Sequence, residues 1–284
     1  MEEKQIKRRF AKAALLVVVA AALLVGGVAT YAWFTSNQTV NTSVAQAHTG
    51  EEALELQLSS TGGADFRGAA EAAITQVNRT DAEYLMPVST ADLRVFVQAS
   101  AYNNLGYPSA FAPVQNEANY YHGRIWLRAI GNGVPAGSRM ALYLDQRGTS
   151  GGILAQKSDG DSLLLNAARL GLVLEGGDSV IFRLSEDRNP AGARMMNTYL
   201  GGELQAEGIV INANLAAVAD PAVTIDSRAI NDDGALGTPL GYLDFERIYV
   251  LDVYFYLEGC DPDCVDSISF DGSDLHLAFY GVLA

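Results

Sequence analysis

Apolar and polar residues alternate along much of the chain, and this two-residue period is typical of β-strands with one buried face. The clearest run spans residues 247–257, and a return segment follows at residues 275–279. Shorter segments with the same period cover residues 93–97, 125–129, 140–144 and 172–184. The pattern therefore predicts an all-β protein built from antiparallel strands.

Helix signals are sparse by comparison. Residues 66–77, which are rich in alanine, and residues 161–170 each predict a short helix; for the second segment the alternative is that it leads straight into the hairpin at residues 172–184. Residues 187–242 are rich in glycine and proline, so we expect long irregular loops there, with short strands such as residues 209–211. Many short strands joined by turn residues favour one antiparallel β-sandwich domain, jelly-roll-like, over residues 51–284.

The start of the chain has a different pattern. A basic stretch precedes an unbroken apolar run at residues 13–29, and small residues follow at Thr30 and Ala32. A signal peptidase reads small residues three and one before the bond it cuts, here the bond between Ala32 and Trp33. Residues 1–32 are therefore predicted to be a signal peptide. An uncleaved membrane anchor is the alternative, because the run is just long enough to span a bilayer.

Either fate of this segment places the remaining chain outside the cytoplasm, in the extracellular space or at the cell surface. Membrane contact is expected only through the N-terminal segment. The formal net charge of the whole chain is −14, and removal of the basic stretch makes the rest more acidic. Nucleic-acid binding rests on basic residues that neutralise phosphates, so we expect no nucleic-acid partner.

Residues 33–50 form a predicted N-terminal arm without charged side chains. Trp33 and Phe34 supply aromatic anchors, and Val40 and Val44 add apolar positions. A strand of this composition can add to an exposed sheet edge of another molecule, where main-chain hydrogen bonds and side-chain pockets hold it. The arm is thus a candidate assembly element. The alternatives are a linker or the first strand of the protein's own sheet.

Cys260 and Cys264 share one short acidic loop. In an exported protein the pair predicts a local disulfide bond. Asp261, Asp263 and Asp266 crowd carboxylate oxygens into the same loop, and Ca²⁺ takes six to eight oxygen ligands. The loop is a tentative calcium site, and a solvated acidic turn is the alternative. We predict no other cofactor.

Sequence motifs of common hydrolases are absent. The chain contains no His-Glu-x-x-His zinc motif and no Gly-x-Ser-x-Gly nucleophile elbow. The sequence therefore predicts a protein that is not an enzyme and has no catalytic residues.

The segment Gly26-Gly27 followed by Thr30-Tyr31-Ala32-Trp33-Phe34 resembles the leader of the TasA and camelysin family of Gram-positive secreted proteins. The Leu-x-Leu pattern at residues 54–58 matches the strand that follows such leaders. The resemblance implies a SipW-type signal peptidase as a partner. It also implies a jelly-roll subunit that forms fibres of a biofilm matrix by donating its N-terminal strand. Camelysin-type proteins are regarded as metalloproteases, so a surface protease is an implied alternative.

These observations together favour a secreted or cell-surface structural protein that associates with itself or with a related matrix protein. A membrane-anchored extracellular ligand-binding module is the main alternative, and a surface hydrolase has less support.

Replacement Ala32→Lys should block processing, because a long charged side chain does not fit the position before the cut. N-terminal sequencing of the wild-type protein should begin at Trp33, whereas the variant should stay in the membrane fraction as a longer form. A mature wild-type protein that begins elsewhere, or unchanged processing of the variant, contradicts the prediction.

Overall fold

The computed structural model describes residues 40–49, 54–63, 65–68, 72–78, 85–102, 108–147, 153–157, 164–184, 198–200, 203–206, 209–212, 222–259, 261, 264 and 273–284. Within these residues the chain is almost entirely β-structure, as the alternation predicts. No helix in this described part is long and apolar enough to cross a membrane. The predicted signal or anchor segment, residues 1–32, lies outside the described residues.

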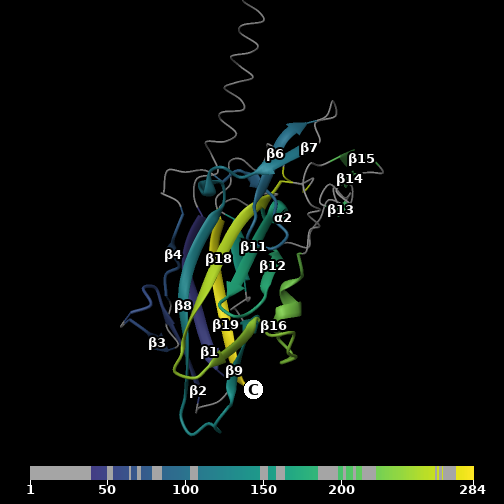
Figure 1. The fold of residues 1–284 in the computed structure, drawn as a ribbon. Helices are drawn as coiled ribbons and strands as arrows, with labels where there is room; N and C mark the ends of the chain where they lie inside the picture. Colours follow the sequence, from purple (N-terminus) through teal and green to yellow (C-terminus); the bar gives the residue numbers. More distant parts are fainter. Residues whose placement is uncertain are drawn as a thin grey trace, which may run out of the picture.

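Two main sheets carry most of the strands. The six-stranded sheet contains β1 (Val40–Thr49), β19 (Ser273–Leu283), β9 (Arg139–Asp145), β16 (Ala229–Ile230), β10 (Ile153–Lys157) and β17 (Gly241–Asp244). The eight-stranded sheet contains β12 (Ser179–Arg183), β11 (Ala168–Leu174), β18 (Ile248–Glu258), β8 (Tyr121–Gly131), β2 (Leu54–Ser59), β3 (Arg67–Gly68), β4 (Thr75–Gln76) and β5 (Pro87–Val88). Figure 1 shows the long strands β8, β18, β1 and β19 running along the length of the molecule.

The remaining elements are short. They are β6 (Val97–Tyr102), β7 (Pro108–Pro113), β13 (Thr198–Leu200), β14 (Glu203–Ala206), β15 (Ile209–Asn212), α2 (Leu164–Ala167), and the 3₁₀ helices η1 (Glu117–Asn119) and η2 (Ile225–Arg228). The hairpin of β6 and β7 lies at the opposite end of the molecule from the C-terminus (Figure 1).

The two main sheets enclose a shared apolar core. Ile125 and Leu127 of β8 and Leu251 of β18 contribute from one sheet, and Leu142 of β9 and Phe279 of β19 contribute from the other; all are fully buried. Every second residue of β8 and of most of β18 points into this core. The arrangement is sandwich-like, because each sheet buries one face against the other.

Most strand pairs are antiparallel, but the first strand is an exception. β1 pairs in parallel with β19, from Val40 opposite Ser273 to Thr49 opposite Gly281, with a register shift between Thr42 and Val44. Among the strands that the structure describes, β19 is the only pairing partner of β1. β1 therefore occupies an edge of the six-stranded sheet.

The sequence prediction for residues 93–97 is wrong. Leu93 has a positive φ of 60° and lies in a turn, and strand β6 begins only at Val97. The hydroxyl of Thr90 accepts a hydrogen bond from the backbone N–H of Leu93, and the Asp92 carboxylate accepts from the next two N–H groups. Such side-chain acceptors mimic a turn and outweigh the apolar alternation. Val95, which the alternation would bury, is 59% exposed.

The first helix prediction needs correction. Residues 66–77 contain the short strands β3 and β4 in their described part, because each of these strands pairs with a longer one. Tertiary pairing with long strands overrides helix propensity there. Residues 161–170 do contain a short helix, the single turn α2, and it leads directly into β11 of the β11–β12 hairpin.

A second, smaller core covers the outer face of the eight-stranded sheet. Leu93, Phe96 and Tyr256 are buried there together. Leu93 sits over Gly171 of β11, where an added Cβ would lie only 2.4 Å from a Leu93 methyl carbon. The glycine therefore provides the space into which the turn inserts its apolar side chain.

Replacement Gly171→Ala should destabilise the protein by about 1–3 kcal/mol, because it overpacks this contact. Leu93→Ala should cost about 2–5 kcal/mol through the cavity it leaves. In the double variant the alanine Cβ occupies part of that cavity, so the measured loss in urea unfolding should be smaller than the sum. Gly63→Ala, at an exposed site, is the control and should change stability little. Strictly additive losses would contradict the packing argument.

Candidate functional site

The predicted assembly arm is described only in part. Val40 and Val44 lie in β1, where their backbone positions are opposite Ser273 and His276 of β19. Trp33 and Phe34 lie outside the described residues, as do the predicted cleavage residues Thr30 and Ala32. The part of the arm that is described thus forms the first strand of the protein's own sheet, which was one of the alternatives.

The cysteine loop is anchored to the sandwich through Asp261. The Asp261 backbone N–H donates to the carbonyl of Glu258, and the Cys264 N–H donates to the carbonyl of Asp261. Cys264 is half-buried and packs against the main core. Cys260, Asp263 and Asp266 lie outside the described residues, so the disulfide and the calcium site stay predictions.

A buried arginine holds this loop. Arg169 at the start of β11 is 1% exposed, and its Nη2 lies 2.6 Å from Oδ2 of Asp261. Its Nη1 donates to the carbonyl oxygen of Ala168 at 3.1 Å. A buried guanidinium needs a carboxylate and further hydrogen bonds to offset its lost hydration. Asp261, the predicted calcium ligand, therefore already has a cation beside one carboxylate oxygen.

A second buried carboxylate lies at the same end of the sandwich. Glu258, the last residue of β18, is 2% exposed and accepts a hydrogen bond from the hydroxyl of Ser89. β5 pairs with β18 at this point, with Val88 opposite Glu258. Sequence reasoning missed Arg169 and its contact with Asp261. The available signal was the presence of a charged residue at the end of an otherwise apolar strand.

The outer face of the eight-stranded sheet carries another polar group of residues. We name His122, Arg124, Asp252 and Tyr254 the outer-face cluster. Residues of β8 and β18 meet there as cross-strand partners, His122 opposite Tyr254 and Arg124 opposite Asp252. His122 Nε2 lies 2.8 Å from Asp252 Oδ1, and Arg124 Nε donates to the same oxygen at 2.9 Å. A carboxylate accepts but does not donate, so Nε2 of His122 carries the proton.

Charge and burial shift two pKa values in the outer-face cluster. Burial would raise the pKa of Asp252, but hydrogen bonds from His122 and Arg124 outweigh it and hold that pKa below its ordinary value. Burial, followed by the negative charge of Asp252, raises the pKa of Tyr254 to about 12. At neutral pH the cluster therefore contains an ionised carboxylate and a protonated phenol.

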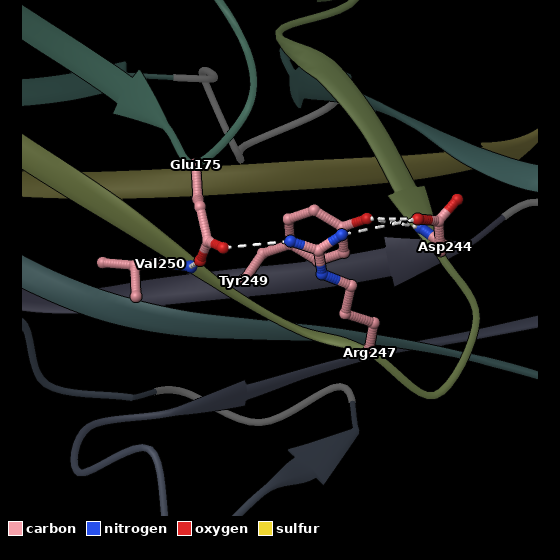
Figure 2. A network of polar contacts seen from close by, with 5 residues as sticks. All are labelled: Glu175, Asp244, Arg247, Tyr249 and Val250. Carbon is pink, nitrogen blue, oxygen red and sulfur yellow. Dashed lines mark hydrogen bonds and ion pairs between the residues drawn. The ribbon is translucent and has the colours of Figure 1, made fainter.

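A third polar network lies where β17 passes into β18 (Figure 2). The Tyr249 hydroxyl donates to Asp244 at 2.8 Å, and Arg247 lies over the Tyr249 ring and donates to Glu175 at 3.1 Å. Glu175 also accepts a hydrogen bond from the backbone N–H of Val250. The network joins the turn after β11 to the connection between the two sheets, so we interpret it as structural.

Within the described residues, no group of three or more His, Cys, Asp or Glu side chains is placed to hold a metal ion. The described part of the chain has hydrogen-bonding and stacked aromatic side chains at the outer-face cluster. It also has a sheet edge formed by the main chain of β1.

Replacement Asp261→Asn should lower the free energy of unfolding by about 3 kcal/mol, because it removes the negative charge beside the buried guanidinium of Arg169. The loss should be the same in calcium and in chelator, as measured by urea unfolding. Asp178→Asn, at an exposed turn, is the matched control and should change stability little. A loss that appears only in calcium would show instead that Asp261 acts through a bound metal.

Comparison with models of known protein families, with curated proteins and with solved structures finds no match to this chain.

Proposed function

We propose that this chain is an exported, non-enzymatic structural protein of a Gram-positive cell surface or extracellular matrix. In this proposal it self-associates by donating strand β1 to a neighbouring copy. The observation that carries the proposal is the edge position of β1 in parallel pairing with β19. Edge strands present unpaired main-chain groups, and exported proteins usually protect them with charge or proline. β1 contains no charged residue and no proline.

Three features of β1 favour exchange between copies. Its pairing is parallel, which is slightly weaker per residue than antiparallel pairing. The register shift between Thr42 and Val44 interrupts the ladder. Only residues 50–53 separate β1 from β2 of the opposite sheet, and short hinges favour domain swapping. The exchanged strand would make the same contacts with β19 of another copy, so exchange costs little free energy.

The leader resemblance gives this proposal its setting. Likeness to the TasA and camelysin family implies a jelly-roll-like sandwich and cleavage after Ala32 by a SipW-type peptidase. It also implies that the protein forms fibres in a biofilm matrix. A related matrix protein is a second partner that the same strand exchange would accept.

The main alternative is an anchored extracellular ligand-binding module that keeps residues 1–32. The outer-face cluster favours this alternative, because it gathers polar and aromatic groups on a partly exposed region beside the smaller core. A camelysin-like protease has less support, since the chain lacks the His-Glu-x-x-His motif.

Deletion of residues 33–49 from the mature protein should abolish assembly and leave a folded monomer, because the main core draws on β8, β9, β18 and β19. Light scattering and electron microscopy measure the assembly. A free peptide of residues 33–49 should raise the melting temperature of the truncated protein, since a ligand that binds only the folded state stabilises it. A scrambled peptide of the same composition is the control.

Two results would reject the proposal. One is a mature protein that stays monomeric at every concentration tested, and the other is a truncated protein that still assembles. If truncation unfolds the protein and the peptide does not restore it, β1 is a permanent strand of its own sheet, and the anchored module becomes the better account.

A further inference from the structure

The outer-face cluster has polar atoms that the fold does not use. The side chains of His122 and Arg124 both bind Asp252 at Oδ1. Among the described residues no hydrogen bond engages Oδ2 of Asp252, Nη1 of Arg124 or the hydroxyl of Tyr254. Solvent reaches this group, since the side chains of Asp252 and Arg124 are 22% and 36% exposed. Asp252 Oδ2 can therefore still accept a hydrogen bond, and Arg124 Nη1 and the Tyr254 hydroxyl can still donate one.

Aromatic rings hold these groups in place. The Tyr254 ring stacks on His122 with centroids 4.4 Å apart and planes 9° apart. Tyr120 stacks on the buried ring of Phe96 at 3.8 Å and lies tilted to Tyr254. A half-exposed Tyr120 ring therefore borders the open polar atoms. Because stacking and the β8–β18 register already fix the rings, binding a ligand here would order few side chains.

The charges of the cluster select the class of ligand. Arg124 and Asp252 neutralise each other through their ion pair, so the pair offers directed hydrogen bonds rather than a net charge. The strongly acidic chain repels anionic polymers at longer range. A purely apolar ligand would leave the open donors and acceptor unpaired, which is costly. A neutral ligand rich in hydroxyl groups satisfies all three conditions.

We propose that the outer-face cluster, with Tyr120 at its border, is a binding site for a neutral saccharide. Asp252 Oδ2 accepts from one sugar hydroxyl, and Arg124 donates to its neighbour, since a carboxylate beside a guanidinium matches two adjacent hydroxyl groups. The Tyr254 hydroxyl donates to or accepts from a third. The Tyr120 ring supplies an apolar surface for the sugar's C–H groups. This site is on the eight-stranded sheet, so it does not depend on assembly through β1.

The test is calorimetric titration of the full mature protein with neutral oligosaccharides: β-1,4-glucan, β-1,3-glucan, β-1,4-N-acetylglucosamine and α-mannan fragments. We expect at least one to bind, and Asp252→Asn and Tyr254→Phe each to weaken binding by about tenfold or more. Tyr242→Phe is the matched control, because Tyr242 is 44% exposed on the other sheet; it should leave affinity unchanged. Thermal unfolding of each variant checks that the fold is intact.

The proposal is overturned if no neutral oligosaccharide binds up to roughly 10 mM, well beyond a specific affinity. It is also overturned if binding is the same in the Asp252→Asn and Tyr254→Phe variants as in the wild type. A polyglutamate peptide is titrated in parallel, and binding of that peptide in place of the sugars would mean that the cluster recognises an anionic chain. The truncated protein lacking residues 33–49 should bind the sugar equally well, which separates this result from failure of the assembly proposal.

Discussion

The pairing of β19 with strands from distant parts of the chain is the contact on which the six-stranded sheet depends. β19 pairs with β1 over most of its length, with β10 near its start and with β9 near its end. The last strand therefore joins the first strand to the middle of the chain. Contacts between such distant segments form late, because the chain must close long loops first. The six-stranded sheet is therefore completed only once the C-terminal residues are available to pair.

β1 is held less firmly than the strands that form the core of the sandwich. The core between the sheets is made by β8, β9, β18 and β19, which hold one another from both sides. β1 adds to one edge and is followed by a short link to β2 in the opposite sheet. An edge strand that is not enclosed by two neighbours is the element most easily exchanged. The same strand follows the predicted arm anchors in the sequence, so the proposed export, processing and assembly would all act on one end of the molecule.

The basic residues of the sandwich also distinguish it from β1. Arginines are paired with aromatic rings on the sandwich: Arg128 with Phe66, Arg139 with Tyr242, Arg147 with Tyr280 and Arg247 with Tyr249. Arg169 is buried against Asp261. These cations stabilise the fold, and the acidic residues in excess keep the surface soluble. β1, by contrast, carries neither charge, so nothing in its composition opposes pairing with another chain.

The sequence was sufficient for the all-β, mainly antiparallel character and for the inward faces of β8, β9 and β18, because alternation reports directly which residues are buried. It failed at Leu93, where the side chains of Thr90 and Asp92 accept hydrogen bonds from backbone N–H groups and impose a turn on an alternating segment. It also could not place Asp252 beside Arg124 and His122. These residues meet only through the register of β8 against β18, and a shift of one residue would turn every side chain to the other face. A polar site made by cross-strand pairs can be located only when the register of the two strands is known.

Strand exchange can be tested by asking whether β1 pairs with β19 of its own chain or of another chain. Gln46 and Ala278 are opposite each other in the β1–β19 register, so cysteines at both positions can report that contact by forming a disulfide bond. Mature protein carrying Gln46→Cys and Ala278→Cys is refolded from a mixture of isotopically heavy and light chains, allowed to assemble and oxidised. Mass spectrometry then identifies the linked peptides. Strand exchange predicts disulfide bonds that join heavy to light peptides in the assembled fraction. Linked peptides that always share one isotope would contradict it.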